Sequence, residues 1–292
     1  MPAIESHAFA GDGLAGEVLA WGVPRLRDLP WRSHRDPWVI LVAEVMLQQT
    51  RVDRVIPKWR AFLDRFPDPA ACAAAPLGDV LRSWHGLGYP RRARYLHETA
   101  ARVVELGGFP DTLEGLLALP GVGAYTARAV LAFAFERDAA VVDTNTARIL
   151  ARVNGDRLSP TKAQRLADSL VPSGEAWIWN QVFMDLGAQI CRPSPQCDVC
   201  PISLRCTWHR SGNADPDPAA GSAGVSQRQA RFEGSDRQVR GQIMNRLVRG
   251  ACNEADLVES VRCDAERVHR LVEALVSERL ITRSGPCVML PE

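Results

Sequence analysis

The chain has 292 residues, a length that accommodates about two domains. With 46% apolar and 24% charged residues, its composition is that of a folded globular protein and excludes a disordered or fibrous chain. The 35 basic and 34 acidic side chains give a net charge of +1, so binding to nucleic acid requires positive charge that is concentrated locally. The first 20 residues lack the pattern of a secretory signal, and no apolar run approaches the ~20 residues of a membrane span.

Apolar residues at three- and four-residue spacing predict one helix after another from residue 14 to about residue 208, with short Pro, Gly and Asp breaks between them. No run in this region alternates long enough to require a sheet. The predicted helices cover residues 38–49, 55–66, 76–84, 93–106, 112–118, 124–135 and 162–170. The pattern therefore predicts an all-α core.

A stretch rich in Gly, Pro, Ser, Asp and Ala follows at 210–227 and predicts a linker over about residues 209–230. Beyond it, residues 231–292 are predicted to form three helices at 236–248, 254–261 and 265–277. Two β-like segments at 280–282 and 287–290 then flank a Ser-Gly-Pro turn. This order predicts a small winged-helix-like segment, although other small helical bundles that end in a hairpin have the same order.

Four of the eight cysteines lie close together in the chain, in the spacing C-x5-C-x2-C-x5-C. Four thiolates within 16 residues can hold one compact centre, either a [4Fe-4S] cluster or a tetrahedral zinc ion. Structural zinc usually joins two close pairs, whereas only one close pair is present here, which favours iron-sulfur. Unliganded buried cysteines are the remaining alternative. The four candidate ligands are Cys191, Cys197, Cys200 and Cys206.

Two further segments are suited to DNA. The string LPGVGAYT at 119–126 stands between two predicted helices, and its glycines allow a tight hairpin whose backbone N–H groups face a phosphate. Residues 82–97 carry four arginines, no acid and three interleaved aromatic residues, a composition suited to phosphate contacts and insertion between bases. Taken singly, each segment is also compatible with a plain helix-helix turn or a solvated basic helix face.

Two carboxyl groups occupy contrasting environments. Glu44 is the single charge within WVILVAEVML, so we expect poor solvation to raise its pKa and let it donate a proton near neutral pH, unless it reaches solvent. Asp143 precedes a predicted helix, where an N-cap carboxylate is held as an anion by backbone donors, and capping alone also explains it. One acid and one anion are what cleavage of a glycosidic bond requires.

Together these motifs resemble the MutY family of adenine DNA glycosylases, which belongs to the helix-hairpin-helix superfamily that includes endonuclease III. The resemblance runs in order from about residue 20 to 208 and rests on the strings PWR, EVMLQQT, GLGY, LPGVGAYT, VDTN and the four cysteines. It implies an all-α, two-domain helix-hairpin-helix glycosylase core at 1–208. Residues 27–138 would form a six-helix domain, and residues 1–26 with 139–208 an iron-sulfur domain.

The resemblance also implies the reaction. The implied partner is double-stranded DNA that contains adenine opposite 8-oxoguanine or guanine. The protein would be a cytoplasmic, nucleoid-associated monomer that flips this adenine out of the duplex and removes it. Glu44 would protonate the adenine, Asp143 would stabilise the sugar cation, and Asn145 and Tyr125 would support it. Tyr125 stands where bifunctional relatives have a lysine, so a monofunctional enzyme is expected. The implied DNA-binding residues are Arg32, Gln48, Gln49, Thr50, Tyr89, Arg91, Gly121, Val122 and Gly123.

Some features depart from the family pattern and leave alternatives open. The first cysteine gap is five residues rather than six, Thr144 replaces a glycine, and the C-terminal segment is too short for the Nudix-like domain of many members. A thymine-guanine mismatch glycosylase and an endonuclease III-like enzyme are the alternatives of the same class. A non-enzymatic iron-sulfur DNA-binding regulator is the alternative from another class.

Overall fold

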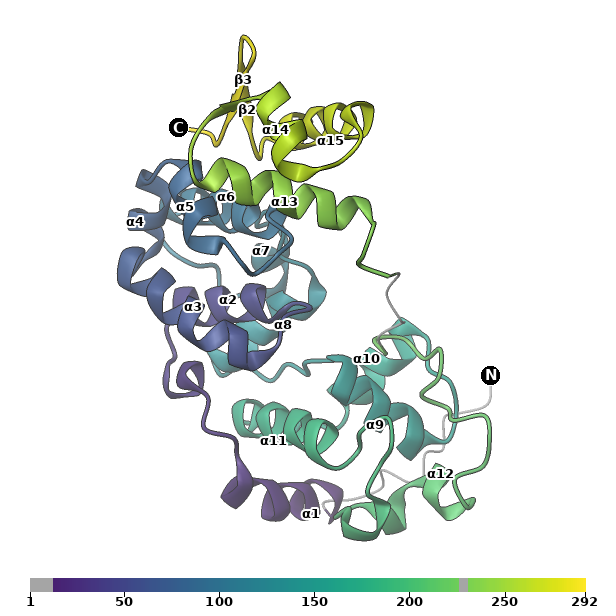
Figure 1. Ribbon diagram of the computed structural model, residues 1–292. Coiled ribbons are helices and arrows are strands. Elements are labelled where there is room, and N and C mark those ends of the chain that lie inside the picture. The colour runs from purple at the N-terminus through teal and green to yellow at the C-terminus, as the bar shows by residue number, and fades with distance from the viewer. Residues whose placement is uncertain (1–12, 226–230) are drawn as a thin grey trace. The chain divides into compact units, whose positions relative to one another are not determined.

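The computed structural model describes residues 13–225 and 231–292, and the described chain is mostly helical (Figure 1). Residues 1–12 and 226–230, which include parts of the predicted N-terminal domain and linker, lie outside the described residues. The chain divides into two compact units. Unit 1 is formed by Met1–Pro37, Asp111–Leu113 and Gly123–Arg228, and unit 2 by Trp38–Pro110, Glu114–Val122 and Gln229–Glu292. The domain limits inferred from the family resemblance stay a prediction.

Unit 1 is built from helices connected by short loops. Asp143 caps the first turn of α9, and the Ser159 side chain accepts from the Lys162 N–H at the start of α10, so both helices begin at favourable N-cap residues. Short 3-10 turns at Val23–Arg25, Pro30–Ser33, Cys197–Val199 and Ser203–Arg205 complete the unit. Its helices are α1 (Gly13–Gly22), α8 (Ala124–Phe133), α9 (Thr144–Asn154), α10 (Pro160–Asp168), α11 (Ala176–Gln189) and α12 (Thr207–Arg210).

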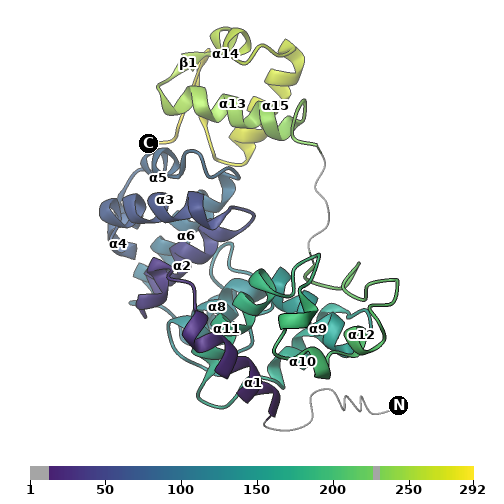
Figure 2. The ribbon, with the colours of Figure 1, turned by 60° about the horizontal axis from the view of Figure 1, so that its bottom comes forward.

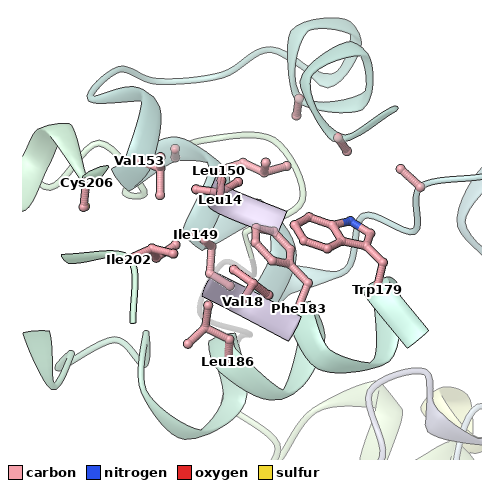
Figure 3. Close-up of a cluster of buried hydrophobic side chains, with 14 of the residues drawn as sticks. Leu14, Val18, Ile149, Leu150, Val153, Trp179, Phe183, Leu186, Ile202 and Cys206 are labelled. Atoms are coloured by element: carbon pink, nitrogen blue, oxygen red, sulfur yellow. The ribbon is translucent and has the colours of Figure 1, made fainter. Parts of the chain in front are cut away.

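The core of unit 1 lies where α1, α9 and α11 meet (Figure 3). Trp179 and Phe183 stack with their ring centroids 4.9 Å apart, and Val18 of α1 packs in the same cluster. The cluster continues through Ile202 and Cys206, so the cysteine region is anchored in the same hydrophobic core as α9.

Unit 2 begins with α2 (Pro37–Leu47), which is apolar around its whole circumference and is buried along almost its entire length. Phe62 lies at the centre of an aromatic cluster, 4.9 Å from Phe66 and 6.2 Å from Trp84 between ring centroids. The remaining helices of this part are α3 (Val52–Arg65), α4 (Pro69–Ala74), α5 (Leu77–Trp84), α6 (Arg91–Glu105) and α7 (Leu113–Leu117).

The C-terminal segment belongs to unit 2. It contains α13 (Asp236–Val248), α14 (Glu254–Val261) and α15 (Ala265–Ser277), which confirm the three helices predicted from periodicity. Strands β1 (Cys252–Asn253), β2 (Thr282–Ser284) and β3 (Cys287–Met289) form an antiparallel sheet in the order β1-β3-β2. Strand β1 was not predicted, and β2 begins at Thr282, the last residue of the predicted segment 280–282. The segment lies beside α5 (Figures 1 and 2), where the Gly78 N–H donates to the Pro291 carbonyl at 2.8 Å.

The predicted linker is only partly a free connection. Ala219 and Ser222 are buried, and the Ala223 N–H donates to the Leu158 carbonyl at 2.9 Å. Asp217 pairs with Arg152 at 2.7 Å. The stretch up to residue 225 therefore packs on unit 1, because its small residues can approach the surface of the unit closely and Asp217 pairs with the buried Arg152. Among the described helices, none has both the length and the apolar composition to cross a membrane.

Candidate active site and cysteine cluster

Asp143 stands at the amino end of α9, in unit 1, with both carboxylate oxygens engaged. The Thr146 N–H donates to Oδ1 at 2.7 Å, which is the capping bond, and the Asn145 side-chain amide donates to Oδ2 at 2.9 Å. The structure thus brings together two of the predicted catalytic residues. Both side chains are half-buried.

The electrostatics of Asp143 differ from the sequence-based expectation. Burial raises the pKa of this carboxyl above its ordinary 3.8, and the hydrogen bonds from Thr146 and Asn145 oppose that effect. The sequence predicted that capping holds this group as an anion. Burial opposes ionisation, and it depends on packing that the local sequence does not show.

A chain of hydrogen bonds connects Asp143 to the cysteine region. Arg148, one turn along α9, donates from Nη2 to the Asn145 side-chain oxygen and to the Gly187 carbonyl, each at 2.8 Å. Its Nε donates to the Cys191 carbonyl at 2.5 Å. Gly187 permits this geometry, because a Cβ there would lie 2.6 Å from the Asn145 Cβ. Any side chain at 187 would push the start of α9 away from α11.

The four predicted cysteine ligands line one cavity of about 20 Å³ in unit 1. Arg152, which is 1% exposed, donates to the Cys191 sulfur at 3.4 Å and to the Arg192 and Pro193 carbonyls at 2.7 and 3.0 Å. These bonds fix the five-residue spacer that distinguishes this cysteine motif. Burial raises the pKa of Cys200 to about 11.

This donor set fits a thiolate-ligated centre. The cavity is otherwise lined mainly by apolar side chains, and the Arg152 cation beside Cys191 would compensate anionic sulfur. Within 13–225 and 231–292, no three His, Cys, Asp or Glu residues are grouped closely enough for a single metal ion. The residues that could hold a polynuclear cluster are Cys191, Cys197, Cys200 and Cys206.

Glu44 lies on α2 in unit 2 and is 5% exposed. Its neighbours Ala43 and Val45 are buried too, so the predicted apolar environment of this carboxyl is confirmed. Glu44 and Asp143 thus belong to different units, and each is positioned by the helix that carries it.

Two unusual backbone positions in unit 2 coincide with predicted DNA-binding residues. Gln49 has φ 55° and Tyr89 has φ 48°, in the left-handed region that bulky side chains rarely adopt. Such strain persists only where surrounding contacts impose it, and it concentrates at functional sites. Tyr89 is 39% exposed, which suits a side chain that contacts a partner.

Arg92 holds both strained loops. Its guanidinium donates to the Gln48 carbonyl at 2.6 Å and the Val45 carbonyl at 2.8 Å, and to the Leu87 carbonyl at 3.1 Å. It also reaches the hydroxyl of Thr50 at 3.5 Å. Burial lowers the pKa of Arg92 to about 10. This arginine therefore fastens the end of α2 to the loop that carries Tyr89.

A cavity of about 340 Å³ opens beside these loops, entirely within unit 2. Its lining includes Gln48, Gln49 and Tyr89, together with Tyr95 and Gly121. The predicted DNA-binding residues Gln48, Gln49 and Tyr89, from both loops, thus line one hollow. Arg91 also lines it and pairs with Glu278 at 2.9 Å, which raises the pKa of the arginine.

The glycine-rich hairpin has the backbone its sequence predicts. Gly121 has φ 72°, and a Cβ there would lie 2.5 Å from the Tyr95 Cβ, so only glycine fits. Val122 is buried and anchors the turn, and Gly123 precedes the first residue of α8. Tyr125 follows in the first turn of α8 and is half-buried.

Arg32 is placed differently from the prediction. It is 9% exposed, and both terminal nitrogens donate to the Asp185 carboxylate at 2.9 Å. Nη1 also donates to the Arg27 carbonyl at 2.9 Å. A guanidinium committed to a buried bidentate pair is not presented to a ligand, so we leave Arg32 out of the proposed DNA interface.

Three residues of this region were missed by sequence reasoning: Arg92, Arg148 and Arg152. All three are arginines that bind backbone carbonyls or carboxylates in the interior. Arg92 lies in the basic stretch that was noted, but nothing in the pattern separated it from its exposed neighbours. For Arg148 and Arg152, the available signal was an arginine on the apolar face of a predicted helix, where charge is costly unless paired.

Comparison with known proteins gives a consistent result. The family model described as "HhH-GPD superfamily base excision DNA repair protein" matches residues 42–173. The chain is 40% identical over 279 residues to an adenine DNA glycosylase of Mycobacterium tuberculosis, which covers 91% of this chain and 90% of that protein.

Among solved structures, a thermostable thymine-DNA glycosylase is 31% identical with a TM-score of 0.63, covering 68% of this chain and 96% of the other. An endonuclease III in a non-covalent DNA complex has a TM-score of 0.61 at 24% identity, covering 73% and 99% of the two chains, a likeness of fold alone. The expected mostly helical fold of the endonuclease III type is confirmed.

Proposed function

Because the chain belongs to the adenine DNA glycosylase family within the HhH-GPD superfamily, we propose that it removes adenine opposite 8-oxoguanine or guanine from double-stranded DNA. It acts as a cytoplasmic, nucleoid-associated monomer that flips the adenine and hydrolyses its N-glycosidic bond. The observation that carries this proposal is the pair Asp143–Asn145 at the start of α9, a carboxylate fixed by two donors on its two oxygens.

The residues divide the reaction between them. Glu44, a carboxyl in an apolar helix, donates a proton to the leaving adenine. Asp143 places negative charge beside the sugar as positive charge develops there, and Asn145 fixes its orientation. Tyr125 cannot form a Schiff base with the sugar, so the product is an abasic site without strand cleavage.

The DNA is held by the loops of unit 2 and the hairpin. Gln49 and Tyr89 enter the duplex from their strained loops, with Gln48 and Thr50 beside them and Arg91 near the phosphates. At the hairpin Gly121, Val122 and Gly123, the backbone N–H groups of the two glycines bind phosphate, while the Val122 N–H donates to the Leu119 carbonyl at 3.2 Å and shapes the turn.

The four cysteines would hold a [4Fe-4S] cluster, with zinc as the less favoured occupant. When bound, this group would cross-link the loop between Cys191 and Cys206. The chain's own residues do the rest, because Arg148 and Arg152 tie this loop to α9. The C-terminal segment is a winged-helix-like module on this proposal, consistent with its three helices and antiparallel sheet.

The testing experiment measures base release from end-labelled duplexes that contain A opposite 8-oxoguanine, A opposite G, or T opposite G. Strand breaks that require hot alkali and occur only on the adenine strand support the proposal. Glu44→Gln and Asp143→Asn abolish them, while Glu105→Gln, a change at an exposed residue, leaves them unchanged.

A thymine-guanine glycosylase is the second candidate, favoured by the 31% identity to the thymine-DNA glycosylase structure. Release only from the T opposite G duplex would establish that alternative instead. Duplex binding without release of any base, by protein with a full complement of iron, would leave the non-enzymatic regulator.

A further inference from the structure

Aromatic rings and guanidinium groups alternate in a series of pairwise contacts in unit 2. The Arg92 guanidinium lies 5.4 Å from the Trp84 ring centroid and 5.3 Å from that of Tyr89. The Arg237 side chain donates to the Tyr89 hydroxyl at 3.4 Å, and its guanidinium lies 5.6 Å from the Phe232 ring centroid. We call these five residues the arginine-aromatic ladder.

The ladder runs from the interior to the surface. Trp84 is 2% exposed, Tyr89 39% and Phe232 54%. Arginine beside an exposed aromatic ring is typical of a surface that binds nucleic acid. The outer part of the ladder therefore has the chemistry of a contact surface, while the inner part anchors it.

The C-terminal segment supplies the outer part and is held firmly beside the Tyr89 loop. Glu278 pairs with Arg91 at 2.9 Å and with Arg240 at 2.5 Å, which joins α6 to α13. The His85 ring lies within hydrogen-bonding distance of the Asn245 side chain, at 2.8 Å. These contacts hold α13, which carries Arg237, beside the loop that carries Tyr89.

We propose that Arg237 and Phe232 extend the DNA-binding surface outward from Tyr89, so that the C-terminal segment contacts the duplex. Arg237 binds a backbone phosphate, and Phe232 packs on the adjoining sugar or base. This inference rests on the proposed function, in which the Tyr89 loop enters the DNA.

The ladder continues the proposed DNA interface at Tyr89 and combines guanidinium groups with exposed aromatic rings, which favours DNA as the partner. Residues 231–292 contain ten arginines and ten acidic residues, so the segment has no net charge to attract an anion non-specifically. Other arginines of the segment are neutralised within it, as Arg267 and Arg270 are by Asp236. Binding through the segment must therefore depend on particular side chains.

The test measures the affinity of the full chain for a fluorescein-labelled duplex with A opposite 8-oxoguanine, by anisotropy over a range of salt concentrations. Arg237→Ala weakens binding about tenfold and lowers the slope of log K against log salt concentration by about 1. Arg237→Lys restores the slope. Phe232 lies outside any helix, and Phe232→Ala weakens binding at least about fivefold without changing the slope.

The matched control is Arg249→Ala, which removes the same charge from an exposed residue at the other end of α13. It lies 12 residues further on, about 18 Å along the helix axis, and is expected to bind like the unaltered chain. Equal affinities for all variants would overturn the inference. Loss of affinity in Arg237→Ala with an unchanged slope would also overturn it, because the arginine would then only position Tyr89.

The same preparations are assayed for release of adenine, which separates the two proposals. An unaltered chain that binds the duplex but releases no base contradicts the proposed function, while the binding of the variants still decides the role of the ladder. Release of adenine with equal binding by every variant contradicts the ladder alone.

Discussion

The buried ion pair between Asp185 and Arg32 is expected to contribute strongly to the stability of unit 1. Asp185 on α11 is 1% exposed, and its carboxylate accepts from both terminal nitrogens of Arg32 at 2.9 Å. It also accepts from the Arg27 side chain at 2.8 Å and the Arg27 backbone N–H at 3.0 Å. Asp185→Asn removes the charge, and the NH2 group that replaces one carboxylate oxygen faces guanidinium donors from which it cannot accept a hydrogen bond.

Breaking a buried pair from one side leaves an uncompensated guanidinium and costs about 3–5 kcal/mol. For a unit of about 150 residues, each kcal/mol shifts the melting temperature by about 2–4 °C. We therefore expect Asp185→Asn to lower the melting temperature of the unit by about 10 °C at pH 7, measured by calorimetry. Asp53→Asn is the control, because its pair with Arg51 is exposed on both sides and screened by water.

The pH dependence of this stabilisation follows from the direction in which the pKa of Asp185 is shifted. Burial acts to raise the pKa of Asp185, but hydrogen bonds from Arg32 and Arg27 outweigh it and hold the pKa below the ordinary 3.8. The pair therefore stabilises the fold fully above the unfolded pKa of about 3.9, and this contribution is lost as the pH falls through the lower, folded value. The difference between variant and unaltered chain is expected to persist at pH 5 and to shrink in stronger acid. Equal melting of Asp185→Asn and Asp53→Asn at pH 7 would refute this reasoning.

Further outcomes are expected at Asp143, Arg92 and Cys200. Asp143→Asn reduces single-turnover adenine release by at least about 10²-fold and leaves duplex binding and melting unchanged. Because burial raises the pKa of Asp143, release by the unaltered chain declines with falling pH at a value above 3.8, and a pH profile flat down to pH 4 would contradict this role. Arg92→Met removes the hydrogen bonds that hold the two strained loops, destabilises unit 2 by about 3 kcal/mol and weakens duplex binding. Unchanged binding in titrations would show that the loops keep their conformation without Arg92. Cys200→Ser lowers the iron content and visible absorbance of the purified protein, and full iron retention would exclude this thiol as a ligand.

The helices were predictable because their causes are local. Apolar spacing predicted α13, α14 and α15 with their observed limits, and Asp143 was recognised as the N-cap of α9. The helix predicted at 162–170 begins two residues earlier, at Pro160, because Ser159 caps it. The glycine of the hairpin was predictable for the same reason, since a turn with positive φ requires it. Strand β1 was not, because two residues carry no periodicity and it exists only by pairing with β3.

The interior arginines needed the tertiary structure. A sequence shows that Arg32, Arg91 and Arg92 are charged, but not that Arg32 is buried against Asp185, or that Arg92 is buried against backbone carbonyls. These pairings join residues far apart in the chain, 153 positions in the case of Arg32 and Asp185. Local pattern carries no information about them, because desolvation and partner choice depend on which elements pack together.

The sequence by itself determined the helical class, the cysteine spacing and the two carboxyl groups suited to breaking a glycosidic bond, since each depends on residues near one another in the chain. Tertiary packing decided how these groups are held. It placed Asp143 in a site where burial opposes ionisation, tied it through Asn145 and Arg148 to the Cys191 carbonyl, and put Arg237 beside Tyr89. The loss of water at Asp143 and the long-range contacts of Arg148 with Cys191 and of Arg237 with Tyr89 arise only when the chain has folded.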